Sequence, residues 1–135
     1  MLIVGAGRSG LTAAREAARA AARGESAATV SRLRAAGHDV VSWDRTGGDI
    51  QCDISDPESV SAALESTVAG HGVPDRLVAC AGVGASGQLV DYTVADWQRV
   101  IDTNLTSMFN VTKQVIDGML DKGWGRIINI SSVNG

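Results

Sequence analysis

The sequence predicts an α/β protein with a doubly wound parallel sheet and helices on both faces, in three layers. Short apolar segments rich in β-branched residues alternate with longer helical segments. This alternation is typical of parallel strands joined by right-handed crossover helices. The last short segment, residues 127–130, has the composition of a strand buried on both faces. The sequence ends soon after it, so the sheet is predicted to be incomplete on its C-terminal side.

The composition limits the classes of function. The chain has 135 residues, 44% of them hydrophobic and 20% charged, which fits one soluble domain spanning residues 1–135. A net charge of −3 gives no electrostatic reason for binding nucleic acid or an anionic membrane. No segment has the length of a membrane span or the form of a signal peptide. Cys52 and Cys80 have neither disulfide nor metal-ligand spacing. We therefore expect a cytoplasmic protein without a metal site, acting on small molecules.

A glycine motif follows the first predicted strand, residues 2–4. Gly5, Gly7 and Gly10 form G-x-G-x-x-G, followed by an alanine-rich helical segment. In this context the motif predicts dinucleotide binding, because glycines let the backbone approach a pyrophosphate at a helix N-terminus. The chain is thus expected to be an NAD(P)-binding domain of Rossmann type. The alternative is a glycine turn that only packs a helix on a strand.

The helical segment after the motif is too long for one crossover helix. Residues 11–36 would span about 39 Å as a single helix. Gly24 is unfavourable inside a helix, so we expect a break there. Ser26 is a candidate cap for a second helix that ends at Gly37.

A strand at residues 38–44 ends in an acid, Asp44. Such an acid can accept hydrogen bonds from the adenine-ribose diol of NAD and would repel the 2'-phosphate of NADP. Asp44 therefore favours NAD slightly, whereas the adjacent Arg45 favours NADP. The alternative is that Asp44 only begins the turn at residues 46–48.

The spacing of this acid raises a second candidate for the phosphate loop. The acid is expected about 20 residues after the glycine motif. From Gly10 to Asp44 the distance is 34 residues, but from Gly24 it is 20. Gly24 is therefore also a candidate cofactor-binding residue.

The middle of the chain predicts two further strands with a helix between them. After a short strand at residues 49–52, Asp56 can cap a helix at residues 57–69 that has proline at its first position. A strand at residues 76–79 then leads into Cys80, Ala81 and Gly82, small residues that permit close approach of a ligand. Cys80 is interpreted as a small apolar residue, not a nucleophile.

The last third supplies the candidate catalytic residues. From Trp97 onward, apolar residues repeat at helical spacing, and Asn104 is the polar residue among them. A polar side chain on a buried face needs a partner. The final strand leads into Ser131 and Ser132, at the sheet edge where ligands of parallel sheets bind. Asn104 and Ser132 are the catalytic candidates.

With these motifs, residues 20–135 resemble the short-chain dehydrogenase/reductase family. Asp53 and Ile54 match the acid and small apolar residue after the family's third strand, near the adenine. Residues 79–82 match its Asn-Asn-Ala-Gly segment, with both asparagines replaced. Asn104 matches the family's buried helix asparagine, and Ser132 matches its catalytic serine. Residues 95–135 most resemble acetoacetyl-CoA and 3-oxoacyl thioester reductases.

The sequence departs from the family in two places. Aligned by its spacing to Asp44, the family's glycine motif falls on residues 19–26, where Gly24 is the glycine that remains. The Tyr-x-x-x-Lys pair is expected beyond Gly135. Its tyrosine is the general acid and its lysine lowers the pKa of that tyrosine. We therefore expect this chain alone to lack turnover.

The resemblance implies an oxidoreductase that moves hydride between NAD or NADP and a small carbonyl substrate, such as acetoacetyl-CoA, giving a hydroxyl. In this interpretation Ser132 donates to the substrate oxygen and Asn104 holds a water of the proton relay. The helix after Trp97 would pack against a partner subunit in a homodimer or homotetramer, or would merely cover the sheet. The alternatives are a non-catalytic nucleotide-binding module and a nonfunctional fragment.

Overall fold

The computed structural model describes residues 2–6, 26–84 and 87–131. The order of its elements is strand, helix, two strands, helix, strand, helix and strand, as predicted. Their bounds are β1 (Leu2–Ala6), α2 (Ser26–Ala35), β2 (Asp39–Asp44), β3 (Ile50–Gln51), α3 (Pro57–His71), β4 (Arg76–Ala79), η1 (Leu89–Asp91), α4 (Val94–Ile101), the π-helical turn η2 (Asp102–Thr106), α5 (Ser107–Asp121) and β5 (Arg126–Asn129).

The strands form one sheet in the order β3-β2-β1-β4-β5. Strands β2 and β3 pair in parallel, as do β4 and β5. Strand β1 runs antiparallel to both of its neighbours. The predicted fold class is confirmed, but the prediction of an entirely parallel sheet is wrong for β1. Strand β1 lies between β2 and β4, whose backbone N–H and C=O groups need hydrogen-bond partners. A parallel or an antiparallel strand can supply those partners, so the need for pairing does not fix the direction of β1.

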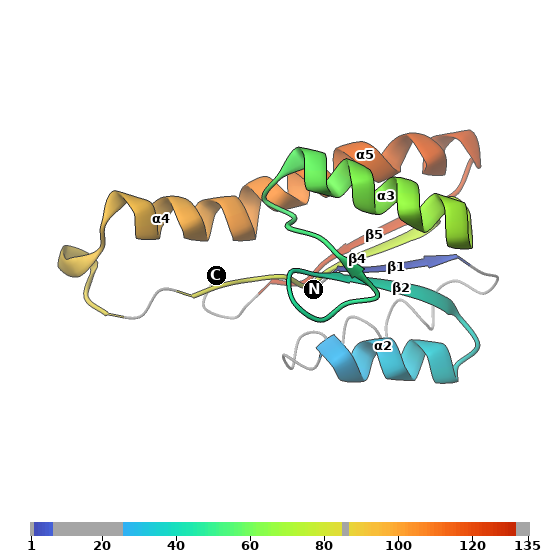
Figure 1. Ribbon diagram of the computed structural model, residues 1–135, viewed down its shortest axis with the longest axis horizontal. Coiled ribbons are helices and arrows are strands. Elements are labelled where there is room, and N and C mark those ends of the chain that lie inside the picture. The colour runs from blue at the N-terminus through green and yellow to red at the C-terminus, as the bar shows by residue number, and fades with distance from the viewer. Residues whose placement is uncertain (1, 7–25, 85–86, 132–135) are drawn as a thin grey trace.

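Helices cover both faces of the sheet in three layers, as predicted (Figure 1). Helix α2 lies on one face, and α3 and α5 lie on the other. Helix α2 begins at Ser26 and is followed by Gly37 at φ +82°, so the predicted end at Gly37 is confirmed, whereas the role of Ser26 as a cap stays a prediction. It packs through Val30 and Leu33 against Val40 and Val78 on the sheet.

The larger core lies between the sheet and the α3–α5 layer. Trp43 is fully buried, and its indole N–H donates to the hydroxyl of Thr67 at 2.9 Å. That hydroxyl donates to the Ala63 carbonyl in turn, so the buried polar atoms are satisfied. The other buried members of this cluster are Val41, Cys52, Val60, Leu77, Ala79, Val111, Val115 and Met119.

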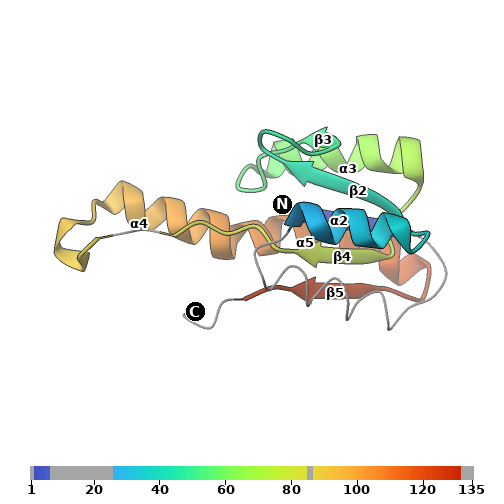
Figure 2. The ribbon, with the colours of Figure 1, turned by 90° about the horizontal axis from the view of Figure 1, so that it is seen from below.

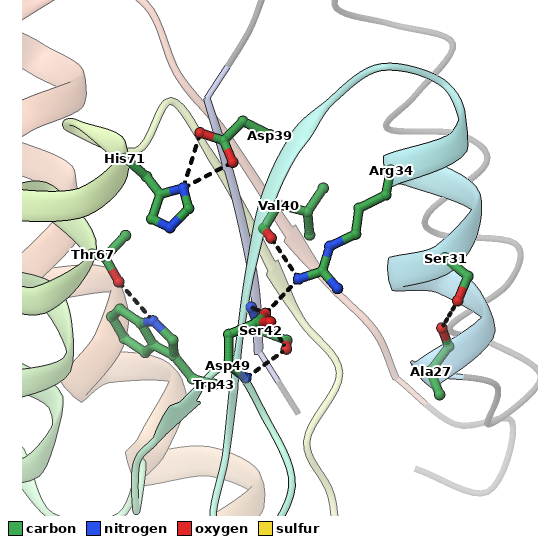
Figure 3. Close-up of polar contacts among 10 residues, drawn as sticks. All are labelled: Ala27, Ser31, Arg34, Asp39, Val40, Ser42, Trp43, Asp49, Thr67 and His71. Carbon is green, nitrogen blue, oxygen red and sulfur yellow. Dashed lines mark hydrogen bonds and ion pairs between the residues drawn. The ribbon is translucent and has the colours of Figure 1, made fainter.

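Helix α3 begins as predicted and ends with an unpredicted contact. Asp56 accepts the N–H of Glu58 at 3.1 Å, and Pro57 occupies the first helical position. His71, the last residue of α3, contacts the Asp39 carboxylate through Nδ1 at 2.9 Å (Figure 3). This pair joins the end of α3 to the beginning of β2.

The long helical stretch of the last third consists of two regions. Residues 89–106, here called the arm, comprise η1, α4 and the π-helical turn and extend beyond the sheet (Figures 1 and 2). None of these three elements has a buried residue, whereas α5 buries five. The expectation that Asn104 lies on a buried apolar face is therefore wrong: Asn104 is exposed and Leu105 is 65% exposed. Apolar residues repeat at the same helical spacing whether the helix packs them against the sheet or leaves them exposed to solvent.

Strand β5 differs from its prediction in burial. It pairs with β4, but Ile127 is 36% exposed and three of its four residues are exposed. The prediction of a strand buried on both faces is thus wrong, because composition does not reveal whether a strand lies at the edge of a sheet. Among the helices of the described ranges, none combines the length and apolar character needed to cross a bilayer.

Candidate nucleotide-binding site

The candidate site is a pocket at the carboxyl ends of β2, β3 and β4. These strands run in one direction, so the residues that follow them meet at the same edge of the sheet. The pocket has a volume of about 190 Å³. It is lined by Trp43, Asp44, Arg45, Thr46, Cys52, Asp53, Ile54, Ala81, Gly82, Val83 and Thr103. Five of the predicted cofactor-binding residues are brought together here.

Asp44 is held at the end of β2 by the loop that follows it. Its Oδ1 accepts the backbone N–H of Thr46 at 2.9 Å and the Thr46 hydroxyl at 3.2 Å. The N–H bond is the main cause of an Asp44 pKa below its usual value. Asp44 is therefore a carboxylate at neutral pH, suited to accepting hydrogen bonds from hydroxyl groups.

Asp53 is held similarly after β3. Its Oδ1 accepts the Ser55 hydroxyl at 2.6 Å and the Ser55 N–H at 3.0 Å, and these bonds lower the pKa of Asp53. The charge of Arg45 lowers that pKa further. The lining of the pocket thus contains two carboxylates, Asp44 and Asp53, and one guanidinium, Arg45.

The segment after β4 is tied to the π-helical turn by Asn104. The Asn104 amide accepts the Val83 N–H at 2.8 Å and donates to the Val83 carbonyl at 2.9 Å. One side chain thereby satisfies both backbone groups of a residue that lines the pocket. Gly82 lies beside it, and a Cβ at Gly82 would be 3.7 Å from the Asn104 oxygen, an ordinary contact.

Among the described residues, no predicted phosphate-binding glycine lines this pocket. Gly5 lies in β1, opposite Val40 and Arg76 near the amino ends of β2 and β4. That edge of the sheet is the one opposite to the pocket. Gly7, Gly10 and Gly24 lie outside the described residues, as does the catalytic candidate Ser132.

The cysteines near the site are not activated. Burial raises the pKa of both the Cys52 and the Cys80 thiol, so neither is a thiolate at neutral pH. The interpretation of Cys80 as a small packing residue agrees with this direction. Within the described ranges, no three His, Cys, Asp or Glu side chains are grouped as metal ligands.

Several other lining residues were not predicted, among them Thr46 and Thr103. Thr46 lies two residues after Asp44, the spacing at which an Asp side chain accepts the backbone N–H in a turn. That signal was present in the sequence. Thr103 precedes Asn104 and lines the pocket from the π-helical turn. No sequence signal distinguishes Thr103, because its placement depends on the path of that turn.

The pocket suits one part of a dinucleotide. Its volume is below the roughly 300–1,000 Å³ of pockets that enclose a drug-sized ligand. Two carboxylates can accept the hydroxyl and amino hydrogens of a nucleoside, and Ile54 and Ala81 offer apolar contact with a base. The residues present therefore fit the adenosine end of NAD or NADP.

Comparison with known proteins gives similar oxidoreductases. An acetoacetyl-CoA reductase of Cupriavidus necator is 53% identical over 83 residues, covering 62% of this chain and 34% of the relative. The solved ligand-free aldohexose dehydrogenase of Thermoplasma acidophilum has a TM-score of 0.73 at 27% identity, covering 80% of this chain and 45% of that one. L-sorbose reductase of Gluconobacter frateurii, complexed with NADPH and L-sorbose, has a TM-score of 0.58 at 27% identity. The match covers 62% of this chain and 32% of that one.

The chain spans about one third to one half of the length of these relatives. The profile of the family described as short chain dehydrogenase matches residues 1–135, the whole sequence. This match agrees with the strand order, with the layers of helices and with a pocket at the carboxyl edge of the sheet. The chain belongs to the short-chain dehydrogenase family.

Proposed function

We propose that residues 1–135 are the cofactor-binding domain of an NAD(P)-dependent oxidoreductase that reduces a carbonyl to a hydroxyl. The observation that carries the proposal is the pocket in which Asp44, Asp53 and Gly82 come together at the carboxyl edge of the sheet. When bound there, the dinucleotide supplies the hydride, and the protein orients it. Asp44 accepts hydrogen bonds from the adenine-ribose diol, and Asp53 faces the adenine.

The proposed substrate is a 3-oxoacyl thioester such as acetoacetyl-CoA. Its support is the identity of 53% to an acetoacetyl-CoA reductase over 83 residues. In this proposal Ser132 donates a hydrogen bond to the substrate carbonyl oxygen. Asn104 contributes by holding Val83 through two hydrogen bonds, which keeps the segment after β4 in place beside the ligand.

We also propose that the intact protein is a homo-oligomer whose interface includes the arm. Its support is a row of exposed apolar side chains at helical spacing: Trp97 is 56% exposed, Leu105 65% and Phe109 64%. Apolar side chains repeated along one helix in this way are typical of a surface that a partner covers. The π-helical turn lies within this row, between Trp97 and Phe109.

A titration with NADH and NADPH tests the cofactor proposal. Energy transfer from tryptophan to the nicotinamide reports binding to the wild-type chain. Asp44→Asn removes the carboxylate, so NADH affinity is expected to fall about 5- to 20-fold while NADPH affinity stays level or rises. Asp39→Asn is the matched control, since it makes the same change at the other end of β2.

Each outcome of the titration has a defined meaning. Saturable binding that changes in Asp44→Asn but not in Asp39→Asn supports the site. Equal loss in both variants, or no binding by the folded wild-type chain, contradicts it. Reduction of acetoacetyl-CoA, assayed with the intact protein because the chain alone is expected to lack turnover, separates an enzyme from the alternative, a nucleotide-binding module without catalysis.

A further inference from the structure

The loop of residues 45–49, between β2 and β3, is fixed at three points around the end of β2. At the first point, both hydrogen bonds from Thr46 go to Asp44 Oδ1, so Oδ2 takes no bond from Thr46. Thr46 thus fixes one oxygen of the carboxylate, and the backbone of Gly47 also hydrogen-bonds to this side chain. Thr46 therefore controls how Asp44 faces the pocket that both residues line.

At the second point, Gly48 lies directly against the backbone of β2. A Cβ at this position would be 2.6 Å from the Ser42 carbonyl oxygen and 2.7 Å from the Asp44 nitrogen. These are backbone atoms of a paired strand, which cannot yield as a flexible side chain does. A larger residue at position 48 would have to lift the loop from β2. At Gly47, its neighbour, a Cβ would point into open space, with no other atom within 4 Å.

At the third point, Asp49 fastens the far end of the loop (Figure 3). Its Oδ2 accepts the Ser42 N–H at 2.7 Å, the Ser42 hydroxyl at 2.6 Å and the Arg34 guanidinium at 2.5 Å. Strand β3 begins at Ile50, opposite Trp43, so Asp49 supplies an acceptor where the ladder has not yet begun. Arg34 also donates to the Val40 carbonyl of β2, so its guanidinium joins α2 both to β2 and to the loop.

We propose that Thr46 is a positioning residue and Gly48 a specificity-determining residue, which together hold Asp44 where it selects NAD over NADP. This inference rests on the proposed function, because Asp44 must read the ribose for its orientation to matter. A loop that lifts from β2 would let the Asp44 carboxylate turn away from the diol. It would also let Arg45, the next residue, move toward a 2'-phosphate.

The test compares Gly48→Ala with Gly47→Ala in the full chain. In Gly48→Ala the Asp44 pKa, measured by NMR of its carboxyl carbon, is expected to rise from its lowered value. The ratio of NADPH to NADH affinity is expected to rise about tenfold, the size of a lost hydrogen bond to a charged group. Gly47→Ala is expected to change neither, because it adds the same methyl group where there is space.

Two further variants keep the test decisive if Gly48→Ala folds poorly. Thr46→Val keeps the backbone N–H but loses the hydroxyl, so the affinity ratio is expected to change about two- to threefold. Thr46→Ser keeps a hydroxyl and is expected to restore the wild-type ratio. A purely structural role of the loop would weaken NADH and NADPH binding equally and leave the ratio constant.

The outcomes separate this inference from the proposed function. If Asp44→Asn changes the affinity ratio but Gly48→Ala and Thr46→Val do not, the site stands and the positioning role is overturned. If the wild-type chain binds neither cofactor, or Asp44→Asn leaves the ratio constant, the proposed function fails and the specificity role fails with it. The Asp44 pKa still decides whether the loop orients the carboxylate.

Discussion

The sheet with its α3–α5 layer and the arm of residues 89–106 use similar sequences in opposite ways. Both carry apolar residues at helical spacing. In α5 that spacing buries Val111, Val115 and Met119 against the sheet. In the arm it leaves Val94 85% exposed and Trp97 56% exposed. The pattern thus identifies an apolar face, but a helix buries that face only where another element lies opposite.

The two regions are also joined differently to the rest of the molecule. The core is connected through strand pairing and dense side-chain contact. The arm contacts the segment after β4 through Asn104 and through a hydrogen bond of 3.5 Å from Arg99 to the Gly84 carbonyl. A region with few buried contacts opens at a lower free energy than the core. Substitutions in the arm should therefore leave the free energy of global unfolding nearly constant.

The largest difference is expected between matched leucine truncations. Leu77→Ala in β4 removes a fully buried side chain, so the free energy of unfolding is expected to fall by about 2–5 kcal/mol. Leu105→Ala makes the same change at a residue that is 65% exposed, and should cost less than about 0.5 kcal/mol. Urea unfolding at low protein concentration measures both values. Similar losses in the two variants would show that the arm is part of the core.

A smaller effect is expected on assembly. Leu105→Glu places a charge in the proposed interface and is expected to weaken self-association by about 1–2 kcal/mol, roughly five- to thirtyfold in the dissociation constant. Val68→Glu is the control, since Val68 is a partly exposed apolar residue of α3, outside the arm. Sedimentation velocity over a range of concentrations gives the dissociation constants. Equal weakening by both variants would argue against an interface that includes the arm.

The local signals in the sequence predicted much of the fold. Gly37 and Asp56 mark helix ends, and each acts through atoms within a few residues of itself. The pocket could be predicted in part for a related reason. Asp44 and Asp53 each follow a strand, and strands of one direction end at one edge.

The features that sequence reasoning missed depend on distant contacts. The antiparallel direction of β1 is decided by pairing with β2 and β4, and Leu2 itself pairs with Trp43 and Ala79. Asn104 pairs with Val83 across 21 residues, so its polar groups are satisfied without burial. The exposure of β5 depends on which other elements pack against this strand. No short segment of the sequence carries such information.

The smallest effects are expected from two short hydrogen bonds between a hydroxyl and a carboxylate, one in each region. Asp53 accepts the hydroxyl and N–H of Ser55, and Asp96 accepts those of Thr93 in the arm. In both cases the hydroxyl bond is the main cause of a lowered pKa. A carboxyl whose folded pKa is lowered stabilises the protein above its unfolded value of 3.8, and this contribution is lost as the pH falls through the folded pKa.

Ser55→Ala should therefore lower the free energy of unfolding by less than about 1 kcal/mol at pH 7 and by progressively less below pH 3.8, where Asp53 becomes protonated in both proteins. Thr93→Ala should raise the pKa of Asp96 with no measurable change in global unfolding, because the arm opens separately from the core. Urea unfolding at neutral and acidic pH, with carboxyl NMR titrations, measures both effects. If the loss of unfolding free energy in Ser55→Ala is the same at every pH, Ser55 stabilises the turn without acting through the charge of Asp53.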